Sequence, residues 1–319
     1  MGTGDQGLGI QAGAVNVLFA SKKEQPEFWL PLLEKALPRD RFFAWPDVNG
    51  GDIDVALIAT HPEGTFEKLP RLSFVQSMWM GVDNIIADPS YPRHVPLARL
   101  IDPGMVNAMG EMVAAQVLDW HRHLYCYREF QRTKTWKMRR QYLPSDRTVG
   151  ILGLGELGGT VAARLRGMGF NVAGWSRRPR GLDGVRCSTD LDEVLCASDA
   201  VVCLLPLTAQ TRGILNRERM QKIRKEGCVI NVARGGHLVA PDLLALLDAG
   251  HLAHAYLDVF EVEPLPPESP LWTHPGISVT PHIAALTEPR TSVAKIAQNL
   301  ERLRRGERPG NLVDFAAGY

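Results

Sequence analysis

The sequence predicts an α/β protein built from two doubly wound parallel sheets. Short apolar runs alternate with helical segments along most of the chain. These runs are continuous rather than alternating apolar with polar residues, which is typical of strands buried on both faces of a parallel sheet. The length of 319 residues corresponds to about two domains, and all the strands are accommodated only if two sheets form.

The composition excludes several classes of protein. With 45% hydrophobic and 22% charged residues, the composition is that of a globular protein. It excludes a collagen-like chain, a disordered chain and a coiled coil. The 36 basic residues balance 35 acidic ones, so no positive surplus favours nucleic acid or a membrane surface as partner. No apolar run approaches the ~18–20 residues of a membrane span, and residues 1–13 do not resemble a signal peptide. The five cysteines contain no CxxC pair, so neither a zinc site nor a redox pair is expected. These features favour a cytoplasmic protein.

In the first part of the chain, the apolar runs predict strands over 15–20, 54–59 and 72–76, with a helix over 31–37. Residues 107–130 differ from this pattern. Their apolar side chains recur at steps of three and four, which predicts one long amphipathic helix. We place the main domain boundary near this helix.

From Thr148 the strand–helix alternation starts again. Strands are expected over 148–153, 171–175, 200–205, 228–232, 254–259 and 277–280. Helices are expected over 160–168, 241–250 and 289–304. Strands separated by helices form right-handed crossovers, and these build a parallel sheet.

A glycine-rich turn is the strongest local motif. Gly153, Gly155 and Gly158 follow the strand at 148–153 and open the next helix together with Glu156 and Leu157. In this context the first glycine makes a tight turn, the second lets the backbone approach a pyrophosphate, and the third packs helix against strand. Because methyltransferases also carry glycine-rich turns there, a second observation has to identify the cofactor.

The end of the next strand supplies that observation. An NAD site carries an acidic residue about 20 residues after the glycines, where it binds the ribose 2′-hydroxyl. This chain has Ser176, Arg177 and Arg178 instead. A hydroxyl and two guanidinium groups suit a 2′-phosphate, because arginine makes forked, charge-assisted hydrogen bonds to phosphate oxygens. The sequence therefore favours NADP (NADPH), with NAD possible.

Charged residues follow three later strands. Arg234 follows the strand at 228–232, acidic residues at 258–263 follow the next strand, and His282 follows the last. Ligands of open α/β sheets bind outside the carboxyl ends of strands, so we expect an arginine, an acid and a histidine to converge there. A cation and a proton donor are what hydride transfer to a keto carbon needs, since negative charge grows on its oxygen.

These motifs resemble the D-2-hydroxyacid dehydrogenase family, and their details are most similar to its glyoxylate/hydroxypyruvate reductase A branch. The similarity runs from about Val15 to Tyr319. The segments that carry it are 77–83, 153–158, 231–236, 258–264, 265–272 and 280–284.

The resemblance implies residue roles. Arg234 would clamp the substrate carboxylate and polarise the keto oxygen, His282 would be the general acid, and Glu263 would pair with His282. Backbone N–H groups around Met80 and Gly81 would hold the carboxylate. The resemblance also implies a substrate-lining tryptophan and further cofactor contacts, at Trp45, Leu205, Pro206, Val232, Ala233 and Asp258.

The resemblance also implies an interrupted architecture. A Rossmann nucleotide-binding domain, residues 107–284, would be inserted into a flavodoxin-like substrate domain made of residues 1–106 and 285–319. Trp136 resembles a tryptophan that reaches the partner subunit in related reductases, so a homodimer is expected. One departure concerns Trp79 and Met80, which are bulkier than the small pair commoner in the family and bear on pocket size.

The function expected from these observations is NADPH-dependent reduction of small 2-oxo acids, glyoxylate to glycolate and hydroxypyruvate to D-glycerate. One alternative is another enzyme of the family with a different 2-oxo acid substrate. A second alternative is a dinucleotide-sensing interaction protein, because the family contains a corepressor that resembles a dehydrogenase. A panel of 2-oxo acids would discriminate between them.

Overall fold

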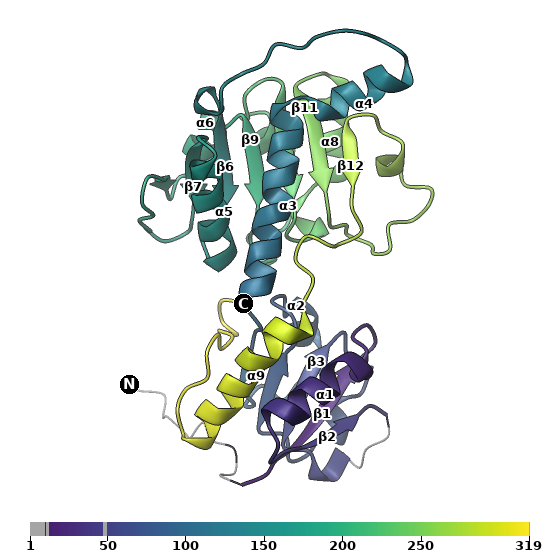
Figure 1. Ribbon diagram of the computed structural model, residues 1–319, viewed down its shortest axis with the longest axis vertical. Helices are drawn as coiled ribbons and strands as arrows, with labels where there is room; N and C mark the ends of the chain where they lie inside the picture. Colours follow the sequence, from purple (N-terminus) through teal and green to yellow (C-terminus); the bar gives the residue numbers. More distant parts are fainter. Residues whose placement is uncertain (1–9, 11–12, 47–49, 319) are drawn as a thin grey trace. The chain divides into compact units, whose positions relative to one another are not determined.

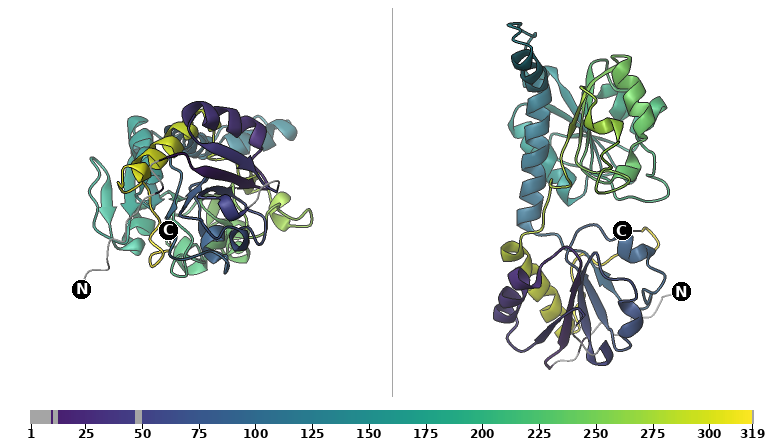
Figure 2. Two further views of the ribbon diagram at one scale, coloured as in Figure 1. Left: turned by 90° about the horizontal axis from the view of Figure 1, so that it is seen from below. Right: turned by 90° about the vertical axis from the view of Figure 1, so that its right-hand side faces the viewer.

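Two compact units make up the chain in the computed structural model. It describes residue 10, residues 13–46 and residues 50–318, so most of the 1–13 leader lies outside the described residues. Unit 1 contains the described residues up to 105 and from 287 onward, and unit 2 contains residues 106–286. Each unit is a parallel sheet with helices on both faces (Figures 1 and 2). The predicted fold class, two doubly wound sheets with one unit inserted in the other, is confirmed.

Unit 1 is a five-stranded parallel sheet with the strand order β2-β1-β3-β4-β5. Its strands are β1 (Asn16–Ser21), β2 (Arg41–Ala44), β3 (Val55–Ala59), β4 (Phe74–Ser77) and β5 (Leu97–Ala98). Its helices are α1 (Pro26–Ala36), α2 (Asp83–Ala87), α9 (Pro289–Arg304) and two short 3-10 helices, Gly50–Asp52 and Phe66–Lys68. The helix expected over 31–37 therefore begins five residues earlier. Pro31 lies inside it on the exposed side, where water can bind the carbonyl that the proline leaves without a donor.

Helix α9 completes the core of unit 1. It lies beside α1 (Figure 1), and Val293, Ile296 and Leu300 are buried in the same apolar cluster as Trp29 of α1. An ion pair joins the two ends of this unit: Arg304 of α9 binds Asp40, and both side chains are almost completely buried. The N-terminal strands thus depend on a helix that follows the insertion.

Unit 2 is a seven-stranded parallel sheet with the order β12-β11-β10-β9-β6-β7-β8. Its strands are β6 (Thr148–Leu152), β7 (Asn171–Trp175), β8 (Arg186–Ser188), β9 (Ala200–Cys203), β10 (Gly227–Asn231), β11 (Leu252–Leu257) and β12 (Ile277–Val279). Helices α3 (Pro103–His121) and α5 (Glu156–Gly167) pack on one face. Helices α6 (Leu191–Ala197), α7 (Arg217–Met220) and α8 (Ala240–Asp248) pack on the other.

The prediction of one continuous helix over 107–130 is wrong, because the structure has two helices in this region. Helix α3 ends at His121, and α4 (Leu124–Arg132) begins after His123, whose φ of 57° is left-handed. A left-handed residue cannot continue a right-handed helix. The imidazole of His123 is held by the carbonyl of Arg140 at 3.1 Å, so the break is tied to the segment that follows α4.

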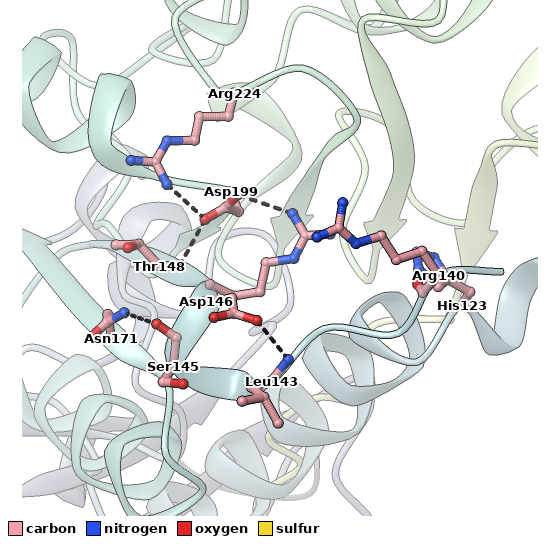
Figure 3. A network of polar contacts seen from close by, with 10 residues as sticks. His123, Arg140, Leu143, Ser145, Asp146, Thr148, Asn171, Asp199 and Arg224 are labelled. Atoms are coloured by element: carbon pink, nitrogen blue, oxygen red, sulfur yellow. Dashed lines mark hydrogen bonds and ion pairs between the residues drawn. The ribbon is translucent and has the colours of Figure 1, made fainter.

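Polar side chains anchor that segment as it enters β6. Figure 3 shows Asp199, at the start of β9, accepting from the N–H of Thr148 at 2.8 Å and from Arg224 at 3.1 Å. Arg147 donates to the same carboxylate at 3.0 Å. These contacts fix the amino-terminal edge of the sheet, opposite to the edge where ligands of such sheets bind. Within residues 13–46 and 50–318, no helix is both long enough and apolar enough to cross a bilayer.

We predict that Arg304→Met destabilises unit 1. The change leaves the buried Asp40 carboxylate without its cation, which typically costs about 3–5 kcal/mol of unfolding free energy. Denaturant titration gives the size of the loss, and hydrogen exchange assigns it to unit 1. The matched control is Arg305→Met, which removes an exposed ion pair with Glu307 and should change stability by less than about 1 kcal/mol. Equal effects of the two variants would contradict the prediction.

Candidate active site

The glycine turn lies between β6 and α5. Gly153 has a φ of 103°, and its N–H donates to the carbonyl of Trp175 at 3.0 Å, which joins the turn to the end of β7. A Cβ at Gly158 would lie 1.9 Å from the Gly153 carbonyl oxygen, so only glycine lets the helix start so close to the turn. A Cβ at Gly155 would meet no protein atom within 4 Å, so the space beside the first turn of α5 is open.

The start of α5 fits a pyrophosphate. Gly155 is the N-cap, and the first N–H that finds a helical partner is that of Gly159, which donates to the Gly155 carbonyl at 2.8 Å. Glu156 is exposed and Leu157 half-buried, so the first turn is accessible from the open side. The unpaired N–H groups and the positive end of the helix dipole suit an anion such as the diphosphate of a dinucleotide.

The turn predicted to bind a 2′-phosphate, residues 176–178, follows β7 and lies beside the glycine turn. Ser176 follows β7, and its hydroxyl donates to the carbonyl of Arg178 at 2.8 Å, which closes a tight turn. The side chains of Arg177 and Arg178 are exposed. A hydroxyl and two arginines therefore occur at the carboxyl end of the strand next to the glycine turn.

The remaining predicted cofactor residues follow the strands on the other side of β6. Leu205 and Pro206 come after β9, and Val232 and Ala233 come after β10. The loops are tied together by His237, whose buried imidazole contacts the carbonyl of Pro206 at 3.2 Å and that of Arg234 at 3.1 Å. The cofactor candidates thus lie at the carboxyl ends of four neighbouring strands, β7, β6, β9 and β10.

His282 and Glu263 form a pair. Nδ1 of His282 lies 2.7 Å from Oε2 of Glu263, and Oε1 of Glu263 accepts from the N–H of Phe260 at 3.0 Å. The imidazole is 44% exposed, so solvent or a substrate reaches it. Because Nδ1 is engaged, Nε2 is the ring nitrogen that can exchange a proton with a ligand.

Asp258 holds the loop that carries His282. Its Oδ1 accepts from the hydroxyl of Thr280 at 2.6 Å and from the N–H of Ile283 at 2.9 Å. Its Oδ2 accepts from the N–H of Ala284 at 2.9 Å, and its backbone carbonyl accepts from the N–H of His282 at 2.8 Å. The Asp258 side chain is fully buried. In this structure the carboxylate is enclosed by the loop, and the contact of Asp258 with the cofactor stays a prediction.

Arg234 lies on the adjoining loop. It follows β10, the neighbour of β11, and its carbonyl accepts from the side-chain amide of Asn231 at 2.9 Å. A Cβ at Gly235 would lie 1.9 Å from the carbonyl carbon of Phe260, so this loop touches the loop that bears Asp258 and Glu263. The guanidinium donates to the carbonyl of Ala233 at 2.7 Å. Arginine, acid and histidine thus come from the ends of three consecutive strands.

The other predicted substrate residues belong to unit 1. Met80 and Gly81 lie between β4 and α2, half-buried, and their N–H groups donate to no atom of the described part of the chain. Trp45 follows β2, with Lys68 Nζ 4.8 Å from its ring centroid. All three are at the carboxyl edge of the five-stranded sheet.

Comparison with known proteins identifies the family. Residues 114–284 match the model of the D-isomer specific 2-hydroxyacid dehydrogenase NAD-binding domain. The chain belongs to the D-isomer specific 2-hydroxyacid dehydrogenase family. It is an NAD(P)-dependent oxidoreductase that reduces 2-oxo acids.

Solved structures extend the similarity beyond this dehydrogenase domain. A D-isomer specific 2-hydroxyacid dehydrogenase from Xanthobacter autotrophicus Py2, in complex with NADPH and MES, is 37% identical, with a TM-score of 0.92, over 96% of this chain and 99% of that one. An NADPH-dependent glyoxylate/hydroxypyruvate reductase from Sinorhizobium meliloti, in complex with NADP and sulfate, is 36% identical, with a TM-score of 0.90, over 96% and 100%. A probable 2-hydroxyacid dehydrogenase from Rhizobium etli CFN 42, in complex with NADP, HEPES and L(+)-tartaric acid, is 32% identical over the same shares, with a TM-score of 0.87.

Sequence reasoning missed the structural role of three residues at the candidate site, of which Asp258 was expected only as a cofactor contact. Asn231 and His237 hold the backbone of the Arg234 loop, and Asp258 holds the His282 loop. All three are buried polar side chains: Asn231 ends β10, His237 lies in the short 3-10 helix that follows, and Asp258 comes directly after β11. A polar residue that interrupts an apolar run at a strand's carboxyl end was the available signal, because a buried polar group has to find hydrogen-bond partners nearby.

We predict opposite phenotypes for alanine at two glycines of the turn. Gly155→Ala should leave thermal stability unchanged, because the Cβ meets no protein atom and the φ of −74° suits alanine. It should weaken dinucleotide binding roughly tenfold or more, about 1.4 kcal/mol, because the Cβ fills the cradle. Gly158→Ala should cost at least about 1–3 kcal/mol of stability through its clash with the Gly153 carbonyl. Calorimetric titration and thermal melts measure both, and unchanged dinucleotide binding by Gly155→Ala would place the pyrophosphate elsewhere.

Proposed function

We propose that this dehydrogenase uses NADPH to reduce small 2-oxo acids, glyoxylate to glycolate and hydroxypyruvate to D-glycerate. The observation that carries the proposal is the His282–Glu263 pair, held at 2.7 Å beside the Arg234 loop. The 36% identity to a glyoxylate/hydroxypyruvate reductase over 96% of the chain supports the substrate class. Other 2-oxo acids are the alternative substrates.

Each residue of this set has a role in the proposed reaction. Arg234 holds the substrate carboxylate, and its guanidinium stabilises the negative charge that grows on the keto oxygen. His282 gives that oxygen a proton from Nε2. Glu263 accepts from Nδ1, which orients the ring. The N–H groups of Met80 and Gly81 are donors for the same carboxylate, and Trp45 lines the site.

We assign the nucleotide to the residues of unit 2 that follow β6, β7, β9 and β10. When bound there, NADPH supplies the hydride for the keto carbon. We assign its diphosphate to the first turn of α5 and its 2′-phosphate to Ser176, Arg177 and Arg178. The further assigned contacts are Gly153, Gly155, Glu156, Leu157, Gly158, Leu205, Pro206, Val232, Ala233 and Asp258. On this assignment residues 107–284 form the nucleotide-binding domain, and residues 1–106 with 285–319 form the catalytic domain.

A homodimer is part of the proposal. The segment between α4 and β6 exposes three large apolar side chains, Trp136, Met138 and Leu143. Several large exposed apolar side chains on one segment are typical of a surface that a second protein covers. A second copy of this chain is the partner that we propose.

His282 tests the reaction. The wild-type enzyme should oxidise NADPH with glyoxylate and hydroxypyruvate, followed by the loss of NADPH absorbance. His282→Ala should lower kcat by roughly 10²–10⁴, the usual contribution of a general acid, while the Kd for NADPH stays the same. Turnover at the wild-type rate in this variant would remove His282 from the mechanism. Absence of turnover with every 2-oxo acid would leave a dinucleotide-sensing role as the better account.

The turn after β7 tests the cofactor. We expect kcat/KM to favour NADPH over NADH by roughly 10²-fold, since two charge-assisted hydrogen bonds contribute about 3–6 kcal/mol before solvent exposure reduces them. Ser176→Asp combined with Arg177→Ala should reverse the preference, because the new carboxylate binds a 2′-hydroxyl and repels a 2′-phosphate. Equal use of both cofactors by the wild-type enzyme would refute this assignment and leave the roles of Arg234 and His282 intact.

A further inference from the structure

The strand order of unit 1 marks one place on its carboxyl edge. In the order β2-β1-β3-β4-β5, the chain leaves β1 toward one side of the sheet and returns through β3 on the other. Connections that diverge in this way open a crevice outside the carboxyl ends of the two strands, where ligands of such sheets bind. The loops after β1 and β3 border it, and they are joined by a hydrogen bond from the Lys22 N–H to the Thr60 carbonyl at 3.1 Å.

Glu24, in the loop after β1, binds two tryptophans at once. Its Oε1 accepts from the indole N–H of Trp79 at 2.7 Å, and its Oε2 accepts from that of Trp29 at 3.0 Å. Trp29 is a buried core residue of α1, and the Glu24 N–H donates to the hydroxyl of Ser21 at 2.8 Å. The carboxylate is thus anchored on one side to the core and presents its other oxygen to Trp79.

Trp79 is fixed in turn by Glu24 and by its own backbone. It lies two residues beyond β4, and its N–H and carbonyl both bind the hydroxyl of Ser77, at 3.1 and 2.8 Å. Lys23 Nζ lies 5.6 Å from its ring centroid. Since β3 lies between β4 and β1, the indole has to pass the end of β3 to reach Glu24. The half-buried ring packs against the apolar cluster that α1 and α9 share, next to these strand ends.

We propose that Glu24 is a positioning residue that holds the Trp79 indole as a wall of the substrate site. This inference rests on the proposed function, in which the neighbouring N–H groups of Met80 and Gly81 hold the substrate carboxylate. A rigid indole one residue away from those donors leaves room for a hydrogen atom or a short side chain on the keto carbon. Glyoxylate and hydroxypyruvate fit this limit, and branched or aromatic 2-oxo acids do not.

The hydrogen bond between Glu24 and Trp79 determines how rigidly the indole is held. An indole without a partner for its N–H can rotate about two side-chain bonds, whereas one that donates to an anchored carboxylate keeps one rotamer. Glu24 therefore acts on selectivity through Trp79 and contacts no substrate itself. Its removal should relax discrimination against longer acids, while binding of the nucleotide, which lies on residues of unit 2, is unaffected.

The test compares kcat/KM for glyoxylate, hydroxypyruvate, pyruvate, 2-oxobutyrate and 2-oxoisovalerate in the full-length enzyme with NADPH. Trp79→Ala should raise the ratio of long to short acids by about 10–100-fold, the range that pocket size commonly gives. Glu24→Ala should raise it in the same direction by a smaller factor, and Glu24→Ala with Trp79→Ala should equal Trp79→Ala alone. Trp79→Phe keeps a ring without the N–H and should resemble Glu24→Ala. The KM for NADPH should stay constant throughout.

A matched control is Glu27→Ala, which removes an exposed glutamate three residues along on α1 and should leave the ratio unchanged. Thermal melts of every variant separate loss of selectivity from loss of fold. A wild-type enzyme that prefers 2-oxoisovalerate to pyruvate, or a Glu24→Ala enzyme with the wild-type ratio, would overturn the inference. Failure of glyoxylate and hydroxypyruvate as substrates would instead refute the proposed function, and the ratio between pyruvate and the longer acids would still test the wall.

Discussion

The buried carboxylate of Asp258 fixes the backbone of the loop that carries His282. It accepts three hydrogen bonds from the 280–284 loop, and its carbonyl accepts a fourth from His282 itself. Hydrogen bonds to a charged group contribute about 1.5–3 kcal/mol each, enough to hold His282 at a φ of 56°, in a region that side chains seldom occupy. Glu263, five residues after Asp258, binds the ring of the same histidine. One short segment after β11 thus holds both the backbone and the side chain of His282.

Each unit offers its own chemistry at the carboxyl ends of its strands. Unit 2 presents charged side chains and an open helix start, which suit a nucleotide and a developing negative charge. Unit 1 presents two peptide N–H groups and a tryptophan clamped by Glu24, which suit a carboxylate and a short side chain. Both sets follow from one rule, that ligands of parallel sheets bind at the carboxyl ends of the strands.

Strands and turns could be predicted from the sequence where their residue types are compatible with few other structures. The glycine turn and strands such as 171–175 are visible because continuous apolar runs and positive-φ glycines leave a clear pattern. Strands β2, β5 and β8 escaped prediction because they lie toward or at the sheet edges and are short or partly polar. The break at His123 depends on a contact with Arg140, and the Glu24–Trp79 bond joins residues 55 apart. Such contacts have no local signal, since they exist only once the fold has brought the partners together.

The insertion of one unit into the other has a consequence for synthesis on the ribosome. The core of unit 1 needs α9, whose Val293, Ile296 and Leu300 pack with Trp29, and α9 emerges only after residues 106–286 have been made. At about 5–20 residues per second this takes roughly 10–40 s. During that time the first hundred residues carry an apolar face with no cover, while unit 2, continuous in sequence, is free to fold. The inner unit can therefore fold while the chain is still growing, whereas the core of the outer unit closes only after α9 has left the ribosome.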